Sequence, residues 1–120
     1  MIRRNNPYKR KDRVASELKK AISYILEFEI NDSRLKEVTL TDLVLTDDLR
    51  HAKIYVSMEM IAQDSRNDTM KALKNARGFI RKNLSSRIRL RYMPSLSFEY
   101  DSSIDYGFRV DDILRGIEND

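Results

Sequence analysis

The basic residues of this 120-residue chain are the ones whose type and spacing point most clearly to a chemical role. Residues 69–98 hold eight Lys or Arg and no Asp or Glu. Because the run holds no acid, salt bridges between residues i and i+4 cannot form within it, and the like charges repel one another. A polyanion such as a nucleic acid is their natural partner. The eight are Lys71, Lys74, Arg77, Arg81, Lys82, Arg87, Arg89 and Arg91.

A second basic cluster lies at the N-terminus, where residues 1–13 hold six basic side chains and one acidic side chain. Residues 14–68 and 99–120 are net acidic, so the net charge of the whole chain is only +4. Two other interpretations of the basic surface stay open: a solvated face without a partner, and a surface that binds an acidic protein. Five residues of this cluster join the candidate RNA-binding set: Arg3, Arg4, Lys9, Arg10 and Lys11.

The sequence offers little for catalysis. It has no Cys and a single His, His51, which excludes thiol chemistry and argues against a histidine metal cluster or a catalytic triad. Asp47 and Asp48 could be imagined as a metal-binding pair of a hydrolase or nuclease. Adjacent side chains of a turn point apart, however, and Asp is a common turn residue. We therefore expect a binding protein that is not an enzyme and uses no cofactor or metal.

The length is that of one globular domain with one hydrophobic core. No apolar run approaches the ~20 residues that span a bilayer. The basic N-terminus lacks the apolar segment of a secretory signal. We expect a cytoplasmic protein that does not contact membranes and is a monomer when free.

The first half of the chain must form a helix and two strands. Apolar residues at helical spacing predict a helix over residues 9–30. Alternating residues predict strands over 39–46 and 52–58, joined by a turn at 47–50. The apolar phase changes across Asp42, which indicates a bulge there.

The basic residues themselves fall on a helical pattern from about Ser65 to Tyr92. A straight helix of this length would span ~39 Å, whereas a globule of this size is only ~35 Å across. Gly78 is the expected break, which also leaves room for a phosphate backbone to approach the main chain. The predicted helical phases place five cations, Ser85 and Gly78 within an arc of ~100° and the apolar residues on the other face. Lys74 and Arg81 should therefore face solvent, so that charge reversal there leaves folding intact.

The end of the chain completes the architecture. Pro94 ends the helical region, Leu96, Phe98 and Tyr100 alternate as in a strand, and residues 106–117 predict a short helix. The order α-β-β-α-α-β-α predicts an α+β domain in which a three-stranded sheet packs on helices.

Four motifs, in order along the chain, resemble the ribosome-binding factor A family. Arg13–Ala15, followed by Leu18, Ile22, Ile25 and Leu26, is similar to the family's first helix. Thr46–Val56 is similar to its strand-turn-strand signature. Ala76-x-Gly78-x-Ile80-Arg81 and then Arg87–Phe98 are similar to its kinked helix pair and last strand. The later Tyr100-Asp101-x-Ser103 with Gly107 and Arg109 also fits.

This resemblance implies a single type II KH-like domain over residues 1–120, in which an Ala-x-Gly kink replaces the GxxG turn of ordinary KH domains. Residues 1–8 would be a basic N-terminal arm and residues 104–120 an acidic C-terminal helix or tail. The implied partners are the 30S ribosomal subunit, pre-30S particles and 16S rRNA. The implied role is support of late 16S rRNA maturation, of 5′-end processing and of growth in the cold. The alternative is a generic KH-like module for single-stranded RNA.

The resemblance also implies the site. It places RNA binding on Lys71, Lys74, Arg77, Gly78, Arg81, Lys82, Arg87, Arg89 and Arg91, with the N-terminal arm as a second candidate.

Overall fold

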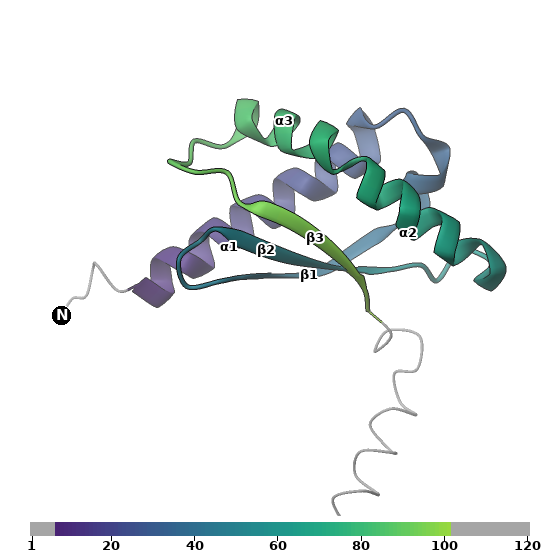
Figure 1. The fold of residues 1–120 in the computed structure, drawn as a ribbon, viewed down its shortest axis with the longest axis horizontal. Coiled ribbons are helices and arrows are strands. Elements are labelled where there is room, and N and C mark those ends of the chain that lie inside the picture. The colour runs from purple at the N-terminus through teal and green to yellow at the C-terminus, as the bar shows by residue number, and fades with distance from the viewer. Residues whose placement is uncertain (1–6, 102–120) are drawn as a thin grey trace, which may run out of the picture.

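The computed structural model describes residues 7–101, which form a three-stranded sheet with helices on one face (Figure 1). Helix α1 spans Pro7–Tyr24, strand β1 spans Thr39–Leu45, and strand β2 spans His51–Ser57. Helices α2 and α3 span Arg66–Asn75 and Arg77–Arg87, and strand β3 spans Ser95–Tyr100. A π-helical turn at Ile25–Glu29 extends α1, and short 3-10 helices occur at Ser33–Glu37 and Gln63–Ser65.

The sheet has the order β1-β2-β3, with β1 antiparallel and β3 parallel to the central strand β2. Leu40 pairs with Val56 and Asp42 pairs with Tyr55, so Thr41 is an extra residue in β1. This bulge confirms the prediction made from the phase change at Asp42. It turns leucines on both sides of it toward the helices.

The hydrophobic core lies between the sheet and the helices. Apolar side chains of β2 and β3 point into it at every second position, as the alternation predicted. The α+β architecture with a three-stranded sheet packed on helices is therefore confirmed. Fully buried core residues include Leu18, Ile22, Ile25, Ile54, Val56, Leu73, Ile80 and Leu84.

The break between α2 and α3 lies at Ala76, within the predicted Ala76-Arg77-Gly78 segment but two residues before Gly78, the expected breaker. The Ala76 N–H donates to the carbonyls of Ala72 and Leu73 at 3.0 and 3.1 Å, a shared bond that tightens and ends the helical turn. Gly78 instead lies in the first turn of α3, and a Cβ built there would meet no atom within 4 Å. The kink therefore does not depend on the missing side chain.

Helix α3 ends at Arg87, so the prediction of a helix to about Tyr92 is wrong. Ile88 is extended, with φ −127° and ψ 134°, and its side chain is buried. The chain leaves the helix here because residues 88–94 must return to the start of β3. Arg89 and Arg91 consequently lie on this connection, and their predicted helical phases do not apply.

Several expectations concern residues outside the described range. Arg3, Arg4 and the C-terminal segment 104–120 lie there, and the single domain over residues 1–120 stays a prediction. Helix α1 begins at Pro7, so the last two residues of the predicted N-terminal arm are helical. No helix in residues 7–101 is long and apolar enough to cross a membrane.

Candidate nucleic-acid interface

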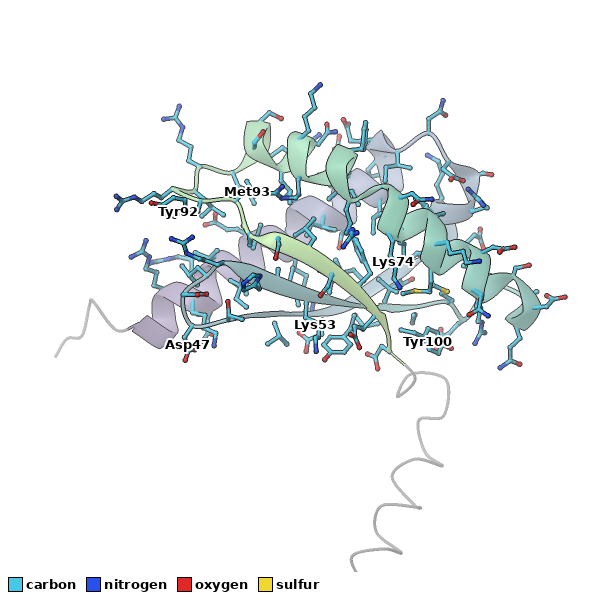
Figure 2. All side chains as sticks on the ribbon, viewed as in Figure 1. Asp47, Lys53, Lys74, Tyr92, Met93 and Tyr100 are labelled. Carbon is cyan, nitrogen blue, oxygen red and sulfur yellow. The ribbon has the colours of Figure 1, made fainter. Side chains whose placement is uncertain are left out.

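Three lysines form the most accessible part of the predicted site. Lys71 and Lys74 lie on α2 and Lys82 lies on α3, and all three are exposed. Their three ammonium groups make no hydrogen bond or ion pair with another residue of the described part of the chain. Figure 2 marks Lys74 on α2. These three ammonium groups therefore remain available to a polyanion. We call Lys71, Lys74 and Lys82 the lysine face.

The guanidinium groups of Arg77 and Arg81 already donate hydrogen bonds to backbone carbonyls of the domain. Arg77 Nε donates to the Lys74 carbonyl at 3.0 Å, and its Nη1 reaches the Leu96 carbonyl at 3.5 Å. Arg81 Nε and Nη2 donate to the carbonyls of Pro94 and Met93 at 3.2 and 3.1 Å. The prediction that Arg81 simply faces solvent is thus incomplete, because its guanidinium connects α3 to the start of β3.

These contacts lie along the outer edge of β3. Ser95 N–H donates to the Arg50 carbonyl next to β2 at 2.8 Å, so alternate residues beginning with Ser95 face β2. The Leu96 carbonyl then points to the outer side of the strand. The guanidinium of Arg77 reaches that side, and Arg81 continues along it.

Arg87 is directed away from this surface, toward α1. Its Nη2 lies 3.2 Å from Glu29 Oε2, and its guanidinium lies 4.5 Å from the Tyr24 ring centroid. The structure therefore separates Arg87 from the other predicted RNA-binding residues and gives it a contact between helices.

Of Arg89 and Arg91, Arg91 shares the Tyr92 ring with Arg50, a residue that the charge count missed. Arg89 and Arg91 are both exposed on the connection between α3 and β3. The Tyr92 ring lies close to the β1–β2 turn, with the Arg50 guanidinium 4.6 Å and that of Arg91 5.6 Å from its centroid. Arg50 belongs to the net-acidic part of the sequence. No local pattern could have found it, because only the parallel pairing of β2 with β3 brings it here.

The N-terminal candidates are divided by the structure. Lys9 and Arg10 lie in the first turns of α1, and Arg10 is exposed. Lys11 Nζ lies 2.8 Å from Asp47 Oδ1, which ties α1 to the β1–β2 turn. Lys11 is therefore a poorer candidate for RNA than its neighbours.

Of the two acidic turn residues, Asp48 stabilises the turn, as predicted, whereas the Asp47 carboxylate pairs with Lys11. Asp48 accepts hydrogen bonds from the Thr46 hydroxyl at 2.7 Å and from the Arg50 N–H at 3.0 Å. These two bonds hold the pKa of the Asp48 carboxyl below its usual range. No group of three or more His, Cys, Asp or Glu side chains in residues 7–101 could hold a metal ion.

Asp32 and Arg34 form a second local pair at the N-terminus of the 3-10 helix Ser33–Glu37. Asp32 accepts from the Arg34 side chain and N–H, with Nη2 2.8 Å from Oδ2. The hydrogen bonds from Arg34, the side-chain bond foremost, lower the pKa of the Asp32 carboxyl. The pair caps this turn, which agrees with a structural role.

Comparison with known proteins identifies the family. Residues 10–114 match the model of the ribosome-binding factor A family. A ribosome-binding factor A from Caldicellulosiruptor saccharolyticus is 44% identical over 109 residues, which cover 89% of this chain and 81% of that protein.

Solved structures agree on the fold. The crystal structure of ribosome-binding factor A from Thermus thermophilus matches with a TM-score of 0.66 at 24% identity, covering 75% of this chain and 93% of that one. A homology model of the Thermus thermophilus protein, fitted into a cryo-EM map of a 30S–ribosome-binding factor A complex, matches with a TM-score of 0.61 at 23% identity, with the same coverage. The family model covers most of the chain and the relative is well above 30% identical, so this chain belongs to the ribosome-binding factor A family.

Proposed function

We propose that this chain binds the small ribosomal subunit, as 30S and as pre-30S particles, through contacts of the lysine face with 16S rRNA. The observation that carries the proposal is the absence of acidic residues from 69–98 together with three exposed lysines whose ammonium groups have no partner in the described part of the chain. Phosphates of a folded RNA are the partner that this surface fits, because they match a row of point charges without a deep pocket. The family of the chain supports the same partner.

The biological role follows from that partner. We propose that the chain supports late 16S rRNA maturation and 5′-end processing in the cytoplasm, and growth in the cold. It would act as a monomer and by binding alone, holding a local rRNA conformation while other factors carry out the chemistry.

Gly78 adds a contact that side chains do not provide. It is exposed in the first turn of α3, next to the lysine face, and open space surrounds the position of its missing Cβ. A phosphate can therefore approach the start of α3, where backbone N–H groups and the helix dipole favour an anion.

The generic module for single-stranded RNA fits this structure less well. A strand of nucleotides laid along the free edge of β3 would compete with Arg77 and Arg81 for the carbonyls of Leu96 and Pro94. In addition, the exposed face of the sheet carries Lys53 and Glu99 with no fully exposed aromatic residue on β2 or β3. Recognition of a folded rRNA by shape and charge needs neither feature.

Sedimentation through a sucrose gradient tests the proposal. The wild-type chain should co-sediment with 30S subunits at low salt and remain at the top of the gradient at high salt. The double variant Lys74→Gln/Lys82→Gln should stay at the top even at low salt. A matched double variant, Lys20→Gln/Lys53→Gln, removes the same charge from exposed lysines on α1 and on the sheet, and it should co-sediment like the wild type.

Two results would contradict the proposal. If the wild-type chain stays at the top of the gradient at low salt, it does not bind the subunit. If both double variants lose binding equally, net charge rather than the lysine face carries the interaction. Melting curves by circular dichroism, unchanged for all variants, would show that folding is not the cause.

A further inference from the structure

We propose that the end of the domain where the β1–β2 turn meets the α3–β3 connection is a second RNA contact, which holds one unpaired nucleotide. Tyr92, Arg50 and Arg91 form this nucleotide clamp. The inference rests on the proposed function, and it adds a separate site with its own ligand: a base that is not paired in the rRNA.

The Tyr92 ring is placed for stacking and is still open. Its side chain is 54% exposed although two guanidinium groups lie within 6 Å of its ring. Arg50, at 4.6 Å from the centroid, supports the ring closely, whereas Arg91 at 5.6 Å is further away. A large exposed aromatic side chain held by arginines is typical of surfaces that stack nucleobases.

The charges around the ring lack acidic partners. No ion pair joins Arg50, Arg89 or Arg91 to a carboxylate in residues 7–101. Asp48 is near in sequence, but its carboxylate accepts from the Thr46 hydroxyl and the backbone N–H of Arg50. The three guanidinium groups can therefore bind phosphates, for which their planar donors are well suited.

The backbone fixes Arg50 before any ligand binds. Leu49 adopts φ 62°, a left-handed conformation that is rare for a residue with a branched side chain. Its N–H donates to the Thr46 carbonyl at 2.9 Å, and the Arg50 carbonyl accepts from the Ser95 N–H at 2.8 Å. The turn is thus held to β3, and Arg50 is held beside Tyr92. Such preorganisation reduces the entropy lost on binding.

A shallow hollow next to the clamp provides room for the rest of the nucleotide. It has a volume of about 360 Å³ and lies along the same connection, with Ser85, Arg89, Leu90 and Arg91 among its lining residues. This volume is within the range of small-ligand sites. The hollow thus combines two cations with apolar lining residues, and it shares Arg91 with the clamp.

These features together define the ligand. A base can stack on Tyr92 only when it is not paired and stacked within a duplex, so the clamp selects a bulged or looped-out nucleotide. Arg50 and Arg91 then hold the phosphates on its two sides. Because every base has a flat π-face, the clamp reads the unpaired state rather than the sequence.

A fluorescent base tests the clamp. The probes are two RNA hairpins of equal length, one fully paired and one with a single bulged 2-aminopurine, whose fluorescence falls when it stacks on an aromatic ring. The wild-type chain should bind the bulged hairpin more tightly and quench its fluorescence. Tyr92→Leu should lose the quenching and about 10-fold in affinity for the bulged hairpin only. Tyr92→Phe keeps the ring and should behave like the wild type.

Arg50→Gln provides the second arm of the test. It should weaken binding of the bulged hairpin, while Lys20→Gln, which removes an exposed charge from α1, should not. If Tyr92→Leu binds both hairpins like the wild type, the clamp is refuted even when 30S binding persists. If the wild-type chain binds 30S subunits but shows no preference for the bulge, the clamp is refuted too, and a protein partner for this end is favoured. Loss of 30S binding by the wild type refutes the proposed function itself.

Discussion

A comparison of Arg81 with its neighbour Lys82 separates the contribution of a cation to folding from its contribution to RNA binding. The Arg81 guanidinium donates to the carbonyls of Pro94 and Met93, whereas the ammonium group of the neighbouring Lys82 has no partner within residues 7–101. We expect Arg81→Gln to lower both the stability of the fold and the affinity for RNA. Lys82→Gln should lower the affinity alone.

The size of the effect follows from the two hydrogen bonds. Bonds from a charged donor contribute about 1.5–3 kcal/mol each when shielded. One of these bonds is partly buried and the other is exposed, so water competes for them. We therefore expect Arg81→Gln to lower the free energy of unfolding by about 1–2 kcal/mol in total. Lys82→Gln should change it by less than about 0.5 kcal/mol.

Urea unfolding followed by far-UV circular dichroism measures both variants. The midpoint for Arg81→Gln should fall with an unchanged slope, because the surface exposed on unfolding stays the same. Arg81→Lys should recover only part of the loss, since an ammonium group cannot match the planar donors of Arg. Equal stability of Arg81→Gln and Lys82→Gln would refute the structural role of Arg81.

The remaining predictions concern other parts of the surface. Lys71→Gln should reduce the slope of log affinity against log salt for an rRNA fragment by about 0.7–0.9, the effect of one phosphate contact; an unchanged slope would remove Lys71 from the interface. Gly78→Ala should raise the free energy of unfolding by about 0.5–1 kcal/mol, because a Cβ there meets no neighbour. Gly78→Leu should weaken RNA binding, and equal binding would argue against a close phosphate. The Asp48 carboxyl should titrate below 3.8 in an NMR titration. Because the pKa of Asp48 is lowered in the folded state, its carboxylate stabilises the fold at pH values above the usual pKa of 3.8. This stabilisation is lost as the pH falls through the folded-state pKa. A titration midpoint at 3.8 or higher would contradict the hydrogen bonds of Asp48.

The strands and their bulge could be predicted because every second side chain of a strand lies on its buried face and is apolar. The phase change at Asp42 could only be reconciled by an extra residue, and Thr41 is that residue. The helix ends were harder to predict. Gly78 has the weakest helix propensity nearby, yet the break lies at Ala76, where the chain turns between two buried faces. Helix α3 ends before Ile88 because the chain must turn back toward β3 there. Helix propensity depends on the residue alone and cannot predict such a turn.

The basic surface could be predicted as a net charge but not as a set of contacts. The lysine face emerged directly from the absence of acids in residues 69–98. The arginines of the predicted site did not behave alike, because a guanidinium reaches several carbonyls or rings, and those partners are assembled only by the fold. Arg50 is the clearest example, since it lies 42 residues before Tyr92, the residue of the connection that it contacts.

The two edges of the sheet bear on how the chain behaves at high concentration. An uncovered edge strand can pair with the same strand of another molecule and start aggregation. On β1 the bulge at Thr41 interrupts the regular ladder. At the start of β3 the guanidinium of Arg77 reaches the Leu96 carbonyl, and that of Arg81 bonds to the Pro94 carbonyl just before the strand. Both devices oppose strand-to-strand association. Loss of Arg81 should therefore also shorten the time for which a concentrated solution of the protein remains clear.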